Sequence, residues 1–477
     1  MSSRVMVRAV AAASILLAGC QLAPRHERPA LPTESEFPAA YAGDPALGKA
    51  AAAIGWRDFF PDPRLKALIE LALQHNRDLS VAVSQIDEAR GLYHIQRADR
   101  LPTIGVTGDA SRNHLGSSSL SATGAGELPP GTSITFDSYS IGVGLSAFEL
   151  DFWGRVRNLS EAARNQYLGT VEAARAFRLS LIRDVASTYL ASLEASERIQ
   201  LAEATVQSRN DGVRIAKRRL DAGVTSALDF RQTETLLTQA ETELAALRQT
   251  KAQSDNLLAV LVGGPAGSAL PDGLPLAQQA GSATIAPGLP SELLNARPDI
   301  LAAEDRLRAS RANIGAARAA FFPSISLTGS FGYASTELNN LVSDDGLTWK
   351  FGPSIDLPIF DFGRRRGNLD VAKARENIAV ATYERAIQTG FQEVSDALAG
   401  RRYLAEQVAA QERGTLAQRQ IANLARTRYR EGVVDYLQVL DAERNLFAAE
   451  QALLQVRRAE AANLVTLYIA LGGGTTQ

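Results

Sequence analysis

Very few side chains in this sequence have the types and spacing that chemistry on a substrate would need. The chain of 477 residues contains one cysteine, Cys20, and four histidines that lie far apart, His26, His75, His94 and His114. This usage excludes a disulfide framework and a Cys/His metal cluster. The sequence contains no nucleophile elbow, phosphate loop or metal-ligand spacing, and its acidic residues are spread along predicted helix faces. We therefore expect neither an enzyme nor a protein that holds a cofactor or a metal.

The one cysteine has an informative position. Two arginines precede an apolar run, residues 9–18, which is too short to span a bilayer and indicates a signal peptide over residues 1–19. The run ends in Leu17-Ala-Gly-Cys20, which resembles the lipobox of bacterial lipoproteins. The likeness implies cleavage before Cys20, lipid on that residue and, because Gln21 rather than aspartate follows, sorting to the outer membrane. The alternative is an unlipidated signal peptide with an incidental cysteine.

Charge and composition narrow the class further. The chain has 50 basic and 52 acidic residues, a formal charge of −2, so no nucleic-acid partner is expected. Aromatic residues make up only 6% of the chain, and alanine is abundant. This composition suits closely packed helices better than a thick aromatic core.

Four segments alternate between apolar and small polar residues, as strands with two different faces do. They cover residues of about 102–112, 136–148, 323–334 and 348–358. In the second, regular alternation continues to Ala147, and a Ser/Gly/Pro-rich loop from His114 to Gly131 precedes it. The pattern predicts two hairpins, each with one apolar face and one face of small polar residues.

The segments between the strands predict long helices. No proline occurs from Gly131 to Gly264, and a helix from Arg155 to Leu220 would extend about 100 Å. Apolar residues at spacings of three and four along this helix indicate a coiled-coil seam. A glycine-containing turn at residues 223–226 ends it, and Ser226 with Asp229 fits a capping box for the next helix.

The second half of the chain repeats this plan. Gly432 corresponds to Gly223, and Asp435 with Gln438 corresponds to the capping box at Ser226. We therefore divide the chain into a signal peptide (1–19), an extended N-terminal tether (20–62), a first repeat (63–264), a linker (265–290), a second repeat (291–474) and a tail (475–477).

The apolar faces of the hairpins indicate a membrane. An open sheet of four strands would leave its edge amides without partners in lipid, so several copies must close a barrel. Two copies would give eight strands and three would give twelve, and the small polar inner face favours the larger, water-filled barrel. One alternative is a soluble α+β protein whose hairpins cover a core. The other is a coiled-coil spacer or adhesin lipoprotein without a pore, which leaves the alternating hairpins unexplained.

Longer motifs carry a family resemblance. Leu293-Leu-Asn-Ala-Arg-Pro-Asp-Ile-Leu-Ala-Ala-Glu304 and the segment from Ala312 to Leu327, with Phe321-Phe322-Pro323 in it, resemble the signature of the outer-membrane factor family. The likeness is to its OprM-like, NodT-type lipoproteins, with TolC more distant, and it extends to the final Leu471-Gly-Gly-Gly474. It implies an α+β membrane protein with two internal repeats: a trimeric, twelve-stranded β-barrel, four strands per protomer, continued by a long periplasmic α-helical coiled-coil barrel.

The resemblance also implies a function. Members are outer-membrane exit ducts of tripartite efflux systems, which pass drugs or other small toxic compounds outward. The partners would be two further copies of the chain, a periplasmic adaptor (membrane fusion protein) and an inner-membrane pump, usually of the resistance-nodulation-division class. The protein would lie in outer-membrane lipid through Cys20 and its barrel, with the helices in the periplasm. A duct for type I protein secretion is the alternative, and the sequence does not name the cargo.

The family's functional positions lie at the helix ends farthest from the strands. The matching turns, which would meet the adaptor, are Gly223, Val224, Thr225 and Ser226 in the first repeat and Gly432, Val433, Val434 and Asp435 in the second. The periplasmic gate would be formed by Leu437, Asp441 and Tyr429. A ring of leucines resists wetting, and a ring of carboxylates concentrates charge at a narrow pore.

Two positions depart from the TolC pattern. TolC-like members carry a second carboxylate at the position of Gln438 and a basic residue at that of Val434, so their gate salt bridges are not carried over. Gln438 also fits the second half of a capping box begun by Asp435. Asp441 also fits a solvated helix surface, and Tyr429 also fits core packing.

Overall fold

The computed structural model describes residues 21–38, 40, 49–116, 133–265, 270–279, 285–286 and 288–474. The predicted signal peptide, Cys20 and the tail lie outside the described residues. The chain divides into two compact units. The sheet unit comprises the chain up to Arg28, Asp87–Leu168 and Asp305–Ala381, and the helical unit comprises Pro29–Ile86, Gly169–Glu304 and Thr382–Gln477. Each unit therefore draws segments from both predicted repeats.

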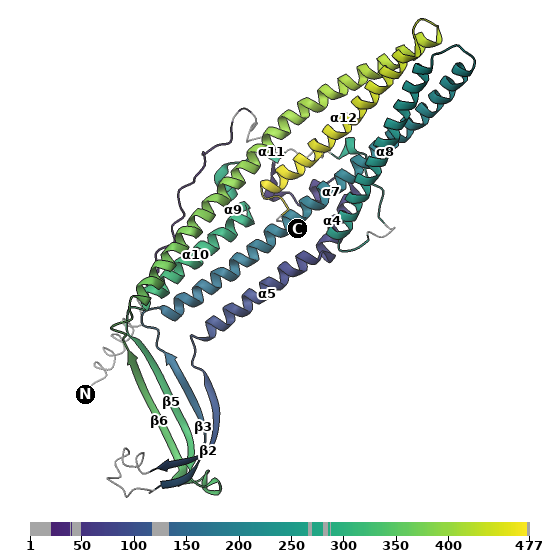
Figure 1. Cartoon of the computed structure of the whole chain (residues 1–477). Coiled ribbons are helices and arrows are strands. Elements are labelled where there is room, and N and C mark those ends of the chain that lie inside the picture. The colour runs from purple at the N-terminus through teal and green to yellow at the C-terminus, as the bar shows by residue number, and fades with distance from the viewer. Residues whose placement is uncertain are drawn as a thin grey trace. The chain divides into compact units, whose positions relative to one another are not determined.

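A four-stranded antiparallel sheet forms the sheet unit, with the strand order β2-β3-β5-β6 (Figure 1). The strands are β2 (Ile104–Gly116), β3 (Ser133–Glu149), β5 (Ser324–Ser335) and β6 (Leu347–Asp356). They lie close to the predicted segments. The exception is residues 114–116, which open the predicted loop but pair with residues 133–135 in the sheet.

The regular alternation predicted as far as Ala147 is wrong at the end of β3. From Leu145 to Phe148 this strand is one residue longer than the facing stretch of β5, and Ala147 has a φ of 28°. Such a bulge bends a strand and turns its following side chains. Here it lies just before the chain leaves the sheet.

The sheet leaves its apolar face uncovered within one chain. Val106, Trp349 and Ile355 are all largely exposed, although each is a large apolar side chain. On β3 and β5, Gly142 pairs with Gly332, and a Cβ on Gly332 would lie 2.3 Å from the carbonyl oxygen of Ile141. The small residues predicted on the polar face thus let these two strands approach closely.

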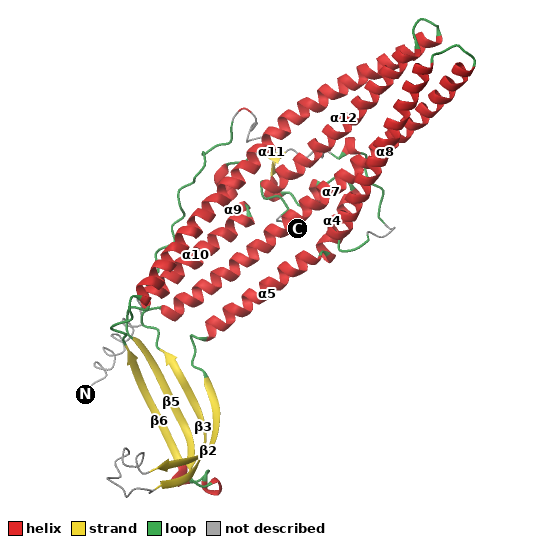
Figure 2. Cartoon of the chain, viewed as in Figure 1, coloured by secondary structure: helices red, strands yellow, loops and turns green. Residues whose placement is uncertain are grey.

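Helices make up most of the remaining described residues (Figure 2). Those within the helical unit are α3 (Trp56–Phe59), α4 (Pro63–His75), α8 (Ala227–Leu261), α9 (Leu293–Ala296) and α12 (Tyr436–Ala470). Four helices contribute residues to both units: α5 (Arg77–Ala98), α7 (Arg155–Asp221), α10 (Pro298–Ala319) and α11 (Arg364–Arg430). A short parallel pair joins β1 (Lys49–Ala50) to β4 (Ile285–Ala286). Within the described part of the chain, no helix has the length and apolar character needed to cross a membrane.

Buried polar groups fix the helical unit from within. Asp62 is fully buried, caps α4 and accepts hydrogen bonds from the Tyr189 hydroxyl at 2.8 Å and the Leu274 amide at 3.0 Å. This carboxylate thus holds the linker against the first repeat. The Arg198 guanidinium pairs with Glu194 and Glu243, both at 3.0 Å, so it joins α7 to α8.

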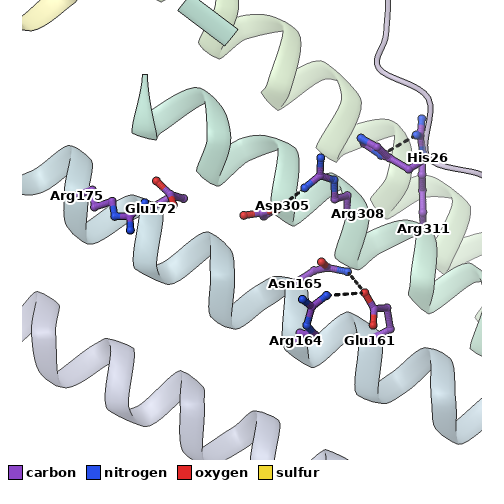
Figure 3. Close-up of polar contacts among 9 residues, drawn as sticks. All are labelled: His26, Glu161, Arg164, Asn165, Glu172, Arg175, Asp305, Arg308 and Arg311. Carbon is purple, nitrogen blue, oxygen red and sulfur yellow. Dashed lines mark hydrogen bonds and ion pairs between the residues drawn. The ribbon is translucent and has the colours of Figure 1, made fainter. Parts of the chain in front are cut away.

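In the sheet unit, the segment that follows Cys20 lies against α10. The Arg318 guanidinium donates to the carbonyl of Leu22 at 2.9 Å. The Arg311 guanidinium donates to the carbonyl of Glu27 at 2.9 Å and contacts the ring of His26 (Figure 3). The part of the predicted tether in this unit is therefore extended and held by its backbone carbonyls.

Candidate functional site

Two turns of the same construction join the long helices at one end of the helical unit (Figure 1). Gly223 and Gly432 follow α7 and α11 with φ values of 70° and 74°. The next amides bond back in the same way, Val224 to the carbonyl of Arg219 and Val433 to that of Arg428, both at 2.9 Å. This is a Schellman-type helix end, in which a residue with positive φ, usually glycine, terminates the helix. The two Gly-Val turns therefore reverse the chain by one mechanism.

The helices that leave the turns are capped differently. The predicted capping box at Ser226 is complete, because its hydroxyl accepts from the Asp229 amide at 3.1 Å and the Asp229 carboxylate accepts from the Ser226 amide at 3.3 Å. A further bond from the Thr225 hydroxyl, together with those at Ser226, lowers the pKa of Asp229. At the second turn, Asp435 accepts from the Gln438 amide at 3.1 Å, and among the described residues no return bond completes the box.

The tips expose apolar side chains. Val224 and Val433 are 62% and 63% exposed and occupy equivalent places in the two turns. Gly223, Ser226, Gly432 and Asp435 are also exposed, whereas Thr225 and Val434 are half-buried. Exposed apolar residues at equivalent places in the two turns are a suitable surface for a protein partner.

Leu437 and Asp441 lie one turn apart at the start of α12, and both are exposed. Residues four apart on a helix share one face, so the two side chains belong to a single surface. The Asp441 carboxylate lies 3.3 Å from the Arg444 guanidinium on the next turn. The predicted carboxylate therefore has a cationic neighbour that sequence reasoning missed.

Tyr429 links three helices at the tips. Its hydroxyl accepts a hydrogen bond from the Arg219 guanidinium of α7, and its ring lies 5.1 Å from that of Tyr436 at the start of α12. The Arg219 guanidinium also lies 5.9 Å from the centre of the Tyr429 ring. This contact set brings together the ends of α7 and α11 and the beginning of α12.

Tyr436 continues this link back to α7. A Cβ on Gly212 would lie 2.7 Å from the Tyr436 hydroxyl, so the tyrosine rests on the bare backbone of this glycine. Burial raises the pKa of the Tyr436 phenol, and the charge of Glu443 acts in the same direction. An isolated glycine inside a long helix was the one sequence signal that could have located this contact.

A buried arginine of α7, Arg209, lies near Glu443 of α12. Arg209 is only 6% exposed and donates to the carbonyl of Leu236 on α8. Burial lowers its pKa, and the nearby charge of Glu443 partly offsets this effect. Glu443 also pairs with Arg426 of α11 at 2.8 Å. Polar and charged contacts thus connect α7, α8, α11 and α12 at the base of the tips.

The remaining predictions concern lipidation and metal binding. Cys20, the predicted lipidation site, lies outside the described residues, although the segment from Gln21 onward is included. Within the described ranges, no group of three or more His, Cys, Asp or Glu residues is placed to hold a metal ion.

Comparison with known proteins defines the family. The family model described as outer membrane efflux protein matches residues 68–264 and 289–473, the second match beginning two residues before the predicted second repeat. The solvent efflux pump outer membrane protein SrpC of Pseudomonas putida is 41% identical over 465 residues, which cover 97% of each chain. The cation efflux system protein CusC of Escherichia coli O6:H1 is 40% identical over 469 residues, covering 97% of this chain and 98% of CusC.

Solved structures agree with these matches. The open state of the MtrE outer membrane channel of Neisseria gonorrhoeae has a TM-score of 0.86 and 38% identity, and the match covers 96% of this chain and 99% of that one. This likeness confirms the predicted fold class, a trimeric channel with a β-barrel, a helical barrel and two internal repeats. The chain is therefore a member of the outer membrane efflux protein family, whose members are channels of the outer membrane.

Proposed function

We propose that this chain forms the exit duct of a tripartite efflux pump for small toxic compounds. Its partners in this proposal are two further copies of the chain, a periplasmic adaptor and an inner-membrane pump of the resistance-nodulation-division class. Relatives of almost equal identity are named for solvent efflux and for cation efflux, which supports a small-molecule cargo rather than a secreted polypeptide. The chain would move its cargo without chemical change and so act as a duct and not as an enzyme.

The observation that carries the proposal is the arrangement at the start of α12. Leu437 and Asp441 are exposed on one face directly after the second turn, beside the link made by Tyr429. Around a threefold axis, each copy would supply one leucine and one carboxylate to a ring. A narrow leucine ring resists wetting, and a carboxylate ring favours cations over anions.

Arg444 modifies this gate. Because its guanidinium lies 3.3 Å from Asp441, each carboxylate of the ring carries a cation beside it. The pair is half exposed, so its attraction is modest and screened by salt. We therefore assign to Asp441 a role in closing the entrance rather than strong ion selectivity.

In the same proposal, the valines of the two turns meet the adaptor. Val224 and Val433 are exposed, apolar and equivalent in the two repeats, so a trimer would present six such sites at its periplasmic end. Tyr429 would keep the helix ends together when the duct is closed, because it connects α7 to α11 and α12.

The test is the conductance of purified trimer in a planar bilayer, with Asp441→Ala as the variant. We expect the wild type to conduct weakly and the variant to conduct several times more, because removing the carboxylate widens the entrance. Cells that make the variant should become more sensitive to large antibiotics. Glu431→Ala, which removes an exposed acid near the turn, is the matched control and should leave both readouts unchanged. An unchanged leak with Asp441→Ala would remove that residue from the gate, and a trimer that never conducts would favour a structural spacer.

A further inference from the structure

The loop between β6 and α11 exposes an unusual amount of apolar surface. Ile359, Phe360 and Phe362 are 79%, 89% and 105% exposed. The loop is nevertheless well ordered by hydrogen bonds, because the Asp361 carboxylate accepts from the amides of Gly363 and Arg365, both at 3.1 Å. Phe362 has a φ of 52°, a conformation that is costly for a bulky residue. The backbone therefore holds the rings of Phe360 and Phe362 outward, away from any core formed by the described residues.

Basic residues follow the exposed rings directly. Arg365 is engaged, since it pairs with Asp361 at 2.7 Å. Arg364 and Arg366 are exposed, and among the described residues neither forms an ion pair. From Asp361 to Arg375 the chain has five basic and two acidic residues, so this surface carries a net positive charge.

The first repeat shows that a strand-to-helix junction does not require this exposure. There, Trp153 stacks on Phe322 at 4.6 Å and donates a hydrogen bond to the carbonyl of Pro323 at 2.9 Å. Arg155 pairs with Glu149, and Phe152 is only 40% exposed. The rings of the second-repeat loop are therefore far more exposed than those of the equivalent first-repeat loop, which keeps one exposed arginine, Arg157.

Two occupants could cover this surface, a second copy of the chain or lipid. A second copy that closes the sheet would bring the edge at the beginning of β2, because β2 and β6 are the two edge strands. The chain just before that edge exposes Arg97 and Arg100 with Asp99 between them, so it carries a net positive charge. Arginines would then face arginines, and juxtaposed like charges oppose binding.

Lipid fits both features of the loop. The apolar face of β6, which includes Trp349 and Ile355, continues through Leu357 to Ile359, and all four are exposed. Phenylalanine side chains insert favourably at the boundary between headgroups and acyl chains, and guanidinium groups bind phosphate through paired hydrogen bonds. We propose that residues 357–366 bind anionic phospholipid headgroups at the periplasmic surface of the outer membrane, with Phe360 and Phe362 inserted and Arg364 and Arg366 on the phosphates. The proposal goes beyond the gate and the cargo and depends only on the outer-membrane location.

The test titrates the purified full-length trimer with phosphatidylglycerol, with phosphatidylcholine and with inorganic phosphate, and counts bound molecules by native mass spectrometry. We expect the wild type to prefer phosphatidylglycerol, and Arg364→Gln with Arg366→Gln to reduce that preference by roughly fivefold for each arginine. Phe360→Ser with Phe362→Ser should weaken the binding of both lipids to the same extent. Inorganic phosphate should not compete, because the acyl chains supply part of the affinity; full competition would make this a free-phosphate site and overturn the lipid assignment.

The control uses the equivalent loop of the first repeat, whose rings are less exposed. Phe152→Ser with Arg157→Gln changes the same residue types in the first repeat and should leave the lipid preference unchanged. Equal binding of the two lipids by the wild type would overturn the proposal. So would a control that loses as much of the preference for phosphatidylglycerol as the arginine variant does. Dissociation of the phenylalanine variant into monomers with its lipid preference intact would assign the loop to a second copy instead. The conductance of the same preparations distinguishes loss of lipid binding from failure of the proposed duct. A variant that still conducts but no longer prefers phosphatidylglycerol has lost only the lipid site.

Discussion

A glycine, which has no side chain, allows the helices near the tip of this protein to pack closely. Gly212 presents bare backbone to the Tyr436 hydroxyl, and Tyr436 in turn lies against Tyr429. Any larger residue at this position would have to displace the tyrosine, because the nearest atom would lie 2.7 Å from the new Cβ. Two aromatic rings and one glycine therefore add to the contacts that Arg219 and Glu443 make at the tip.

We expect Gly212→Ala to raise the conductance of the trimer, because displacing Tyr436 loosens the link between α7 and α12. The second substitution Tyr436→Phe removes the atom that the new methyl group would strike and should return conductance towards the wild-type value. Gly414→Ala is the control, since a Cβ there meets nothing within 4 Å. Equal conductance of Gly212→Ala and Gly414→Ala would mean that the tyrosine does not restrain the tip.

The cap of α8 should weaken in acid. Hydrogen bonds from Thr225 and Ser226 lower the pKa of Asp229 in the folded protein. A lowered folded pKa means that the stabilisation is present above the unfolded pKa, about 3.9, and is lost as the pH falls through the folded value. Amide hydrogen exchange at residues 222–229, corrected for its intrinsic pH dependence, should therefore accelerate below about pH 4. Asp229→Asn should exchange faster already at neutral pH and show no further acid step.

At the scale of elements, the contact between β3 and β5 depends on paired glycines. Gly332→Ala would bring a Cβ to 2.3 Å from the Ile141 carbonyl and 2.5 Å from Gly142, where backbone rather than a flexible side chain must move. We expect the free energy of unfolding to fall by about 1–3 kcal/mol, the range for overpacking. The measurement is the temperature at which the trimer dissociates.

Gly352→Ala is the matched control for the sheet. Gly352 lies on β6 in the same sheet, and a Cβ there meets nothing within 4 Å. It should leave the dissociation temperature unchanged. A similar loss in both variants would show that glycine is needed for backbone freedom rather than for the approach of two strands.

At the scale of the whole molecule, membrane anchoring should have two independent parts. Cys20→Ser should abolish labelling by palmitate, because it removes the predicted acceptor. The variant should still fractionate with the outer membrane, since the apolar face of the strands is unaffected. Retained labelling would contradict the predicted lipobox, and release from the membrane would mean that the strands do not anchor the protein alone.

The sequence by itself determined the elements of this protein and the family to which it belongs. Alternation of period two marked four strands, long proline-free segments marked the paired helices, and Gly223, Ser226 and Gly432 marked their ends. These features depend on neighbours within a few residues, so they are visible in a linear pattern. The repeat and its motifs then predicted an outer-membrane channel, which the family match confirms.

Only the tertiary structure decided which distant residues meet. It brought Arg219 to Tyr429, set Tyr436 on Gly212 and left Phe362 uncovered. It also showed a bulge at Ala147 where the pattern predicted regular alternation. These outcomes depend on how side chains of two helices or two strands fit together, and each fit depends on volumes on both sides. A periodic pattern records which face of an element is apolar, but not the residue that each side chain on that face will contact.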